Sequence, residues 1–143
     1  MERGQILNRD LFLYLLDLEV KRARRYQNFF CILKLKLVPL PGHEDDKELE
    51  NSYCILRRLL TETLRDSDIL GSLENYQLAV ILPYADPENS HHVRLRFESM
   101  LAHYDLKKES YSISIHETCF PRDGTVPADL IPKVTQPPAE PEA

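Results

Sequence analysis

Residues 65–83 read RDSDILGSLENYQLAVILP, and this stretch decides the fold. Two short apolar runs, Ile69–Leu73 and Tyr76–Leu82, stand on either side of a polar break that contains Asn75. Asparagine tolerates a positive φ, so the break predicts a tight β-hairpin turn. Ala79–Leu82 is apolar throughout, which is typical of a strand covered on both faces. The stretch therefore predicts a central hairpin in a sheet that has helices packed against it.

The residues before the hairpin predict a helix, a strand and a second helix. Asn8 is a good N-cap, and a broad apolar helical face follows it. That face is expected to comprise Leu11, Phe12, Leu15, Leu16, Leu18 and Val20. Phe29–Val38 predicts a strand, because apolar residues alternate with Lys34 and Lys36. The second helix is expected to run from about Asp46 to Leu64.

The residues after the hairpin predict a helix, a strand and a shortened last helix. Pro87 suits the first turn of a helix that reaches about His103. Residues 111–116 alternate apolar and polar side chains, which indicates a half-buried strand. Pro127 is expected to start the last helix, and Pro132 is expected to stop it within a turn or two.

The chain of 143 residues has the length of a single domain. We assign residues 1–135 to that domain and expect the proline-rich tail, residues 136–143, to be disordered because it has no core-forming residues. The order of elements predicts an α/β (α+β) fold with a central, mostly antiparallel sheet flanked by helices.

Composition excludes several classes of function. The chain has 18 basic and 23 acidic residues, a net charge of −5, and no basic block, which argues against nucleic-acid binding. No apolar run approaches the length of a membrane span, so a cytoplasmic protein is expected. Cys31, Cys54 and Cys119 fit neither a disulfide framework nor a metal motif and are expected to be buried thiols. Histidines 91 and 92 are expected to lie at a solvated helix start, and no metal site is predicted.

Four strings, in order, are similar to motifs of the bacterial GGDEF (diguanylate cyclase) family. ILNRDLF at 6–12 resembles GLxNRxxF, and RARRYQNFFCILKLKL at 22–37 resembles ARRYxxPLxLLLLDLD. Residues 65–83 parallel RxSDxxxRxGGDEFxxLLP without a gap, and SISIHETCFPRDGT at 112–125 resembles VSIGVAxxPxDGxT. The resemblance covers about residues 5–130 and implies a nucleotide-cyclase-like fold, with the family's long final helix truncated.

The same resemblance implies that the cyclase chemistry has been lost. Diguanylate cyclases use carboxylates to hold the metal ions that offset phosphate charge, and glycines that let the backbone approach the phosphates. The five signature positions are here Glu74, Asn75, Tyr76, Gln77 and Leu78. The metal-binding Asp of the first strand corresponds to about Lys36, which repels cations. We therefore expect a degenerate domain with no catalytic residues, no bound magnesium and no cyclase activity.

A second family site is retained in the sequence. Arg65 and Asp68 match the RxxD inhibitory motif, which binds cyclic di-GMP in active cyclases, and Arg96 falls where family members often add an arginine. Guanidinium and carboxylate groups suit the two edges of guanine. Arg58 and Arg94 are further candidates for phosphate neutralisation. The same residues also suit a local ion pair and a solvated helix face.

Two functions follow from this reading. The first is a regulatory module that binds cyclic di-GMP through Arg65, Asp68 and Arg96. The alternative is a protein–protein interaction scaffold that binds no nucleotide and contacts a partner protein or a second copy through a helix or the hairpin. A residual enzyme ranks last, because the metal ligands are missing.

Overall fold

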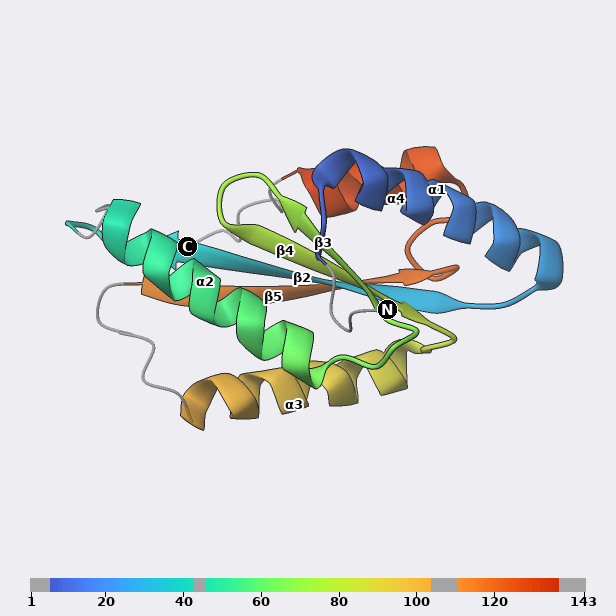
Figure 1. Ribbon diagram of the computed structural model, residues 1–143. Helices are drawn as coiled ribbons and strands as arrows, with labels where there is room; N and C mark the ends of the chain where they lie inside the picture. Colours follow the sequence, from blue (N-terminus) through green and yellow to red (C-terminus); the bar gives the residue numbers. More distant parts are fainter. Residues whose placement is uncertain (1–5, 43–45, 104–110, 137–143) are drawn as a thin grey trace.

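The computed structural model describes residues 6–42, 46–103 and 111–136. Within these residues, helices and strands alternate around one mixed sheet (Figure 1). The elements are β1 (Ile6–Leu7), α1 (Arg9–Tyr26), β2 (Phe30–Pro39), α2 (Asp46–Thr63), β3 (Ile69–Leu73), β4 (Gln77–Pro83), α3 (Pro87–His103), β5 (Tyr111–Phe120) and α4 (Pro127–Thr135).

The sheet has the strand order β1-β3-β4-β2-β5. Only the β1–β3 pair is parallel, and the other three pairs are antiparallel. The predicted hairpin is β3–β4, which pairs Ile69 with Ile81 and Leu73 with Gln77. The predicted fold class, an α+β domain with a mostly antiparallel sheet, is confirmed.

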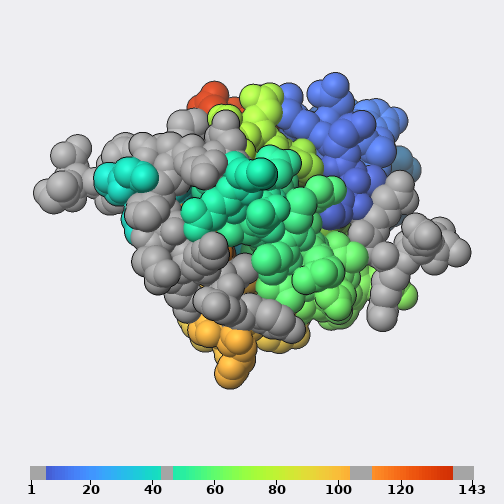
Figure 2. Space-filling model, turned by 60° about the vertical axis from the view of Figure 1, so that its left-hand side comes forward, coloured from blue at the N-terminus to red at the C-terminus, as the bar shows by residue number. Residues whose placement is uncertain are grey.

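The sheet separates two apolar cores. On one face, Cys31, Leu33 and Leu35 of β2 pack with residues of α2 and α3. On the other face, Phe30 and Ile32 of β2 pack with residues of α1 and α4. Figure 1 shows these two pairs of helices on opposite sides of the strands. In Figure 2 the surface of α2, in teal and green, lies between the blue surface of α1 and the orange end of α3.

Most predicted boundaries agree with the structure. The predicted apolar face of α1, however, is wider than the face that is buried. Asn8 caps α1 as predicted, since Leu11 N donates to Asn8 Oδ1 at 2.9 Å. Phe12 and Leu16 are fully buried, but Leu11 and Leu18 are exposed. The buried stripe of α1 is narrower than the apolar stripe, because the sheet contacts only one side of the helix.

Two other predictions were wrong. Helix α4 continues through Pro132 to Thr135, with Leu130 and Val134 buried on either side of the proline. Burial of this face outweighs the backbone hydrogen bond that Pro132 cannot donate. Cys31 and Cys119, expected to be thiols, form a disulfide, because they lie directly opposite each other in the β2–β5 register. Cys54 is a free thiol but is exposed.

The predicted boundary between the domain and a disordered tail at residues 136–143 stays a prediction, because residues 137–143 lie outside the described part of the chain. None of the described helices is both long and apolar enough to cross a membrane.

Candidate functional site: the hairpin and the turn that leads into it

The hairpin turn presents Glu74, Asn75 and Tyr76 at one end of the sheet. Asn75 and Tyr76 both have φ of 59°, so the turn needs two residues in the left-handed region and not only the asparagine. Tyr76 O accepts a hydrogen bond from Leu37 N at 3.1 Å, which ties the turn to β2. The ring of Tyr76 meets Tyr53 of α2 edge-on, with the ring centroids 5.6 Å apart.

Lys36 and Gln77 are direct partners in the β2–β4 ladder, so these two signature-equivalent positions lie side by side. Gln77 is buried, and its Nε2 donates to Glu74 O at 2.9 Å. Its Oε1 is buried and has no hydrogen-bond partner within the described residues. Position 77 therefore supports the turn through its amide and offers one neutral oxygen beside an ammonium group.

A small cavity of about 110 Å³ lies under this turn. It is lined by Arg9, Lys36, Leu73, Glu74, Asn75, Gln77 and Thr135. Its only carboxylate among these residues, Glu74, is 3.4 Å from Arg9 Nε. The lining carries two cations and one anion, a balance that disfavours a divalent metal.

Lys34, two residues before Lys36 on β2, faces His116 in the β2–β5 ladder. Lys34 Nζ donates to Gln136 O at 2.9 Å, and burial together with the charge of Lys36 lowers the pKa of Lys34. Burial, and then the charges of Lys34 and Arg94, lower the pKa of His116. No group of three or more potential metal ligands occurs among the described residues.

Arg65 and Asp68 close the turn between α2 and β3. Arg65 N donates to Asp68 Oδ2 at 2.9 Å, Asp68 N donates to Arg65 O at 3.0 Å, and Arg65 Nε is 3.9 Å from Asp68 Oδ2. The Asp68 side chain is 2% exposed, whereas that of Arg65 is 66% exposed. Asp68 Oδ1 is buried and unpartnered within the described residues. The local ion pair and the exposed guanidinium are therefore both present.

Arg96 lies on the exposed side of α3, beside Ser99, Met100 and His103. Thr63 Oγ1 donates to Met100 Sδ at 2.9 Å, which joins the end of α2 to α3. Thr63 is the last residue of α2, and the loop with the RxxD motif follows it directly. This loop therefore begins close to Met100, which lies one helical turn after Arg96 on α3.

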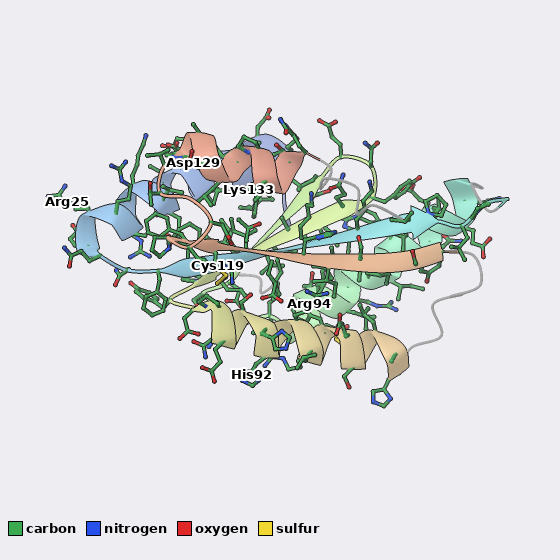
Figure 3. All side chains as sticks on the ribbon, turned by 180° about the vertical axis from the view of Figure 1, so that it is seen from behind. Arg25, His92, Arg94, Cys119, Asp129 and Lys133 are labelled. Atoms are coloured by element: carbon green, nitrogen blue, oxygen red, sulfur yellow. A yellow bond between two sulfur atoms is a disulfide. The ribbon has the colours of Figure 1, made fainter. Side chains whose placement is uncertain are left out.

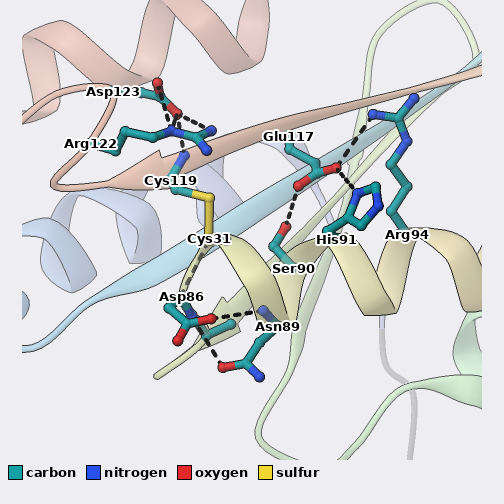
Figure 4. Close-up of a disulfide and its surroundings, with 11 residues drawn as sticks. Cys31, Asp86, Asn89, Ser90, His91, Arg94, Glu117, Cys119, Arg122 and Asp123 are labelled. Carbon is teal, nitrogen blue, oxygen red and sulfur yellow. Dashed lines mark hydrogen bonds and ion pairs between the residues drawn. A yellow bond between two sulfur atoms is a disulfide. The ribbon is translucent and has the colours of Figure 1, made fainter.

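Arg94, considered above as a phosphate contact, is engaged elsewhere. Its Nη1 is 3.4 Å from Glu117 Oε1 and its Nε is 3.3 Å from Glu98 Oε2. Figure 3 shows Arg94 directed toward the sheet, whereas His92 lies on the far side of α3. Sequence reasoning missed Glu117, and no motif marked it. Its carboxylate also accepts from Ser90 Oγ at 3.1 Å and lies 3.7 Å from His91 Nδ1 (Figure 4). These contacts depend on how α3 packs on β5.

Comparison with protein-family models and with curated proteins found no match. Solved structures do match. A diguanylate cyclase protein from Thermotoga maritima has a TM-score of 0.75 at 18% identity, over 92% of this chain and 94% of that one. The GGDEF domain of FimX from Pseudomonas aeruginosa has a TM-score of 0.76 at 17% identity, over 92% and 85%. A microbial GGDEF domain, described in its interaction with cyclic di-GMP, has a TM-score of 0.71 at 16% identity, over 92% and 81%.

These matches define the class of the molecule as an α+β domain with a mostly antiparallel sheet covered by helices on both faces. More specifically, the chain has the fold of GGDEF domains, as the motif resemblance predicted.

Proposed function

We propose that this chain is a catalytically inactive GGDEF-like domain that binds cyclic di-GMP through Arg65, Asp68 and Arg96. The observation that carries the proposal is the RxxD turn between α2 and β3. It holds Asp68 in place through the backbone of Arg65 and leaves the Arg65 guanidinium exposed. An arginine in this position can donate two parallel hydrogen bonds to a guanine edge.

The inactivity rests on the charges at the hairpin. Lys36 and Gln77 stand opposite each other where a cyclase needs carboxylates, and Glu74 is engaged by Arg9. Two magnesium ions and a triphosphate would meet two cations and one anion there, which opposes their assembly. Incubation with GTP and Mg²⁺ or Mn²⁺ is expected to yield no cyclic di-GMP.

Calorimetric titration of the chain with cyclic di-GMP tests the binding. We expect a dissociation constant of about 1–10 μM, typical of a modest polar site. Arg65→Ala should weaken binding about 10- to 100-fold, because it removes a charged hydrogen-bond donor. Asp68→Asn keeps an acceptor for Arg65 N but loses the charge, and should also weaken binding.

Arg24→Ala is the matched control, since Arg24 is an exposed arginine on α1, which covers the other face of the sheet from α2 and α3. The Arg24→Ala variant should bind cyclic di-GMP with the same affinity as the unmodified chain. Absence of any binding heat with the unmodified chain would end the proposal.

One observation favours the alternative, an interaction scaffold that binds no nucleotide. Leu11, Tyr14 and Leu18 form an exposed apolar stripe on α1, and their exposed fractions are 44%, 59% and 42%. Such a stripe is typical of a helix that contacts another protein. If the scaffold function is correct, Arg65→Ala has no effect in cells, and replacing Leu18 by a charged residue abolishes function while the fold persists.

A further inference from the structure

Strand β5 is an open edge of the sheet. It is 10 residues long and pairs only with β2 among the described strands, in a register that runs without a bulge from Phe30↔Phe120 to Pro39↔Tyr111. The opposite edge, β1, has only 2 residues. Edge strands are usually protected by lysine, proline, a bulge or short length, and β5 has none of these.

One end of this edge is closed within the chain. Cys119 N donates to Asp123 Oδ2 at 2.7 Å, and Asp123 N donates to Cys119 O at 2.8 Å. The backbone groups of Cys119 therefore point away from β2. Because these groups alternate along an antiparallel strand, those of Ile113, Ile115 and Glu117 point outward too. They have no backbone partner within the described part of the chain.

The side chains beside this open edge are apolar on the face that α3 covers. A groove of about 300 Å³ runs between α3 and β5. It is lined by Glu98, Leu101, Ala102, Tyr111, Ser112, Ile113 and Ile115. A strand added next to β5 would therefore place alternate side chains against an apolar surface, and its backbone would meet unpaired donors and acceptors.

We propose that β5 pairs antiparallel with β5 of a second copy of this chain, so that the two sheets become continuous. One self-complementary register centres the pairing on Ser114. With Ser114 opposite Ser114 of the second copy, Ile113 faces Ile115, and Ser112 faces His116. The outward-pointing residues then pair with outward-pointing residues, as backbone hydrogen bonding requires.

The register one step toward the C-terminus is less favourable. It would place Ile115 opposite itself and Ile113 opposite Glu117, whose carboxylate is held by Ser90 and Arg94. A strand pairing of this length buries less surface than a permanent dimer needs, so the dimer should depend on protein concentration.

Cysteine cross-linking tests the register directly. In a Cys54→Ser background, which removes the exposed native thiol, Ser114→Cys is compared with Ser112→Cys. The register brings the Cα atoms of the two residues 114 to about 4.5 Å, within disulfide range. The two residues 112 would stand roughly 13 Å apart, too far for a bond. Mild oxidation should yield covalent dimer for Ser114→Cys alone. Equal yields from the two variants, or no dimer from Ser114→Cys, would overturn the proposal.

Sedimentation velocity supplies an independent measurement. The unmodified chain should shift from monomer to dimer as its concentration rises. Ile113→Pro removes an outward N–H without removing a β2–β5 hydrogen bond, and should raise the dimer dissociation constant at least tenfold while the circular dichroism spectrum is kept. A chain that stays monomeric up to about 1 mM, a concentration at which even a weak complex of about −4 kcal/mol forms, overturns the proposal. If Ile113→Pro does not fold, the cysteine pair decides.

Discussion

At the scale of single residues, Lys34 is the clearest conflict between sequence pattern and environment. It is only 3% exposed, in the middle of the sheet, and its ammonium group donates to Gln136 O at the C-terminal end of α4. A helix C-terminus favours a cation, which partly offsets the cost of burial. Burial and the nearby charge of Lys36 nevertheless lower the pKa of Lys34 below its usual value of 10.5.

Lys34→Met should therefore stabilise the protein. A buried charge replaced by an apolar side chain of similar length is expected to raise the free energy of unfolding at pH 7 by about 1–2 kcal/mol. Because the folded state releases the Lys34 proton at a lower pH than the unfolded state, the stability of the unmodified protein rises between the folded pKa and 10.5. The variant should lack this rise. Urea unfolding from pH 7 to 10.5 measures both effects.

Lys36→Met is the matched control. Because Lys36 is only partly buried, this substitution should raise the free energy of unfolding less than Lys34→Met does. A Lys34→Met protein that is less stable than the unmodified chain at pH 7 would show that the bond to Gln136 outweighs the burial of charge.

At the scale of elements, the packing of α1 on β3 depends on one glycine. A Cβ added at Gly71 would overlap the ring of Phe12. Phe12 is completely buried in the core between α1, α4 and the sheet. Gly71 thus allows a helix to approach a strand closely, which is a recognised role of glycine within strands.

Gly71→Ala should reduce the free energy of unfolding by about 1–3 kcal/mol, since overpacking must push Phe12 or α1 away from the sheet. In a Phe12→Ala background, which keeps Cβ but removes Cγ and the rest of the ring, the same substitution should cost less. A double-mutant cycle by urea unfolding measures this coupling. Equal costs in the two backgrounds would mean that the contact between Gly71 and Phe12 does not determine the packing.

Most element bounds were predictable to within a residue or so, for identifiable reasons, but β5 continues four residues beyond the predicted strand at 111–116 and β1 was not predicted. Helix α3 begins at Pro87 and β4 ends at Pro83, as the prolines indicated. The exceptions arose where tertiary contacts decide. Pro132 did not end α4, because Leu130 and Val134 bury the helix on the core. Leu11 and Leu18 are exposed because the apolar pattern of α1 is wider than its contact with the sheet.

At the scale of the whole molecule, hydrophobic periodicity does not determine the order of the strands in the sheet. Contacts of the candidate site that join distant parts of the chain could therefore not be predicted either. Arg65 and Asp68 are close in sequence, so their turn was predictable. The engagement of Arg94 by Glu117 and the approach of Lys34 to Gln136 join residues far apart in the chain. The same is true of Cys31 and Cys119, which are 88 residues apart and meet only because β2 pairs with β5.

The disulfide should make stability depend on redox conditions. It closes most of the domain into one loop and fastens the edge strand β5 to the central strand β2. Closing so long a loop restricts the unfolded chain, so reduction should lower the free energy of unfolding by about 4 kcal/mol. Thermal melting with and without dithiothreitol measures the change. Cys54→Ser should retain the full sensitivity, because Cys54 is outside the disulfide, whereas Cys31→Ala combined with Cys119→Ala should melt identically in both conditions. If dithiothreitol leaves the melting temperature of the unmodified protein unchanged, the prediction is wrong, and hydrogen bonds and side-chain packing alone hold β2 and β5 together.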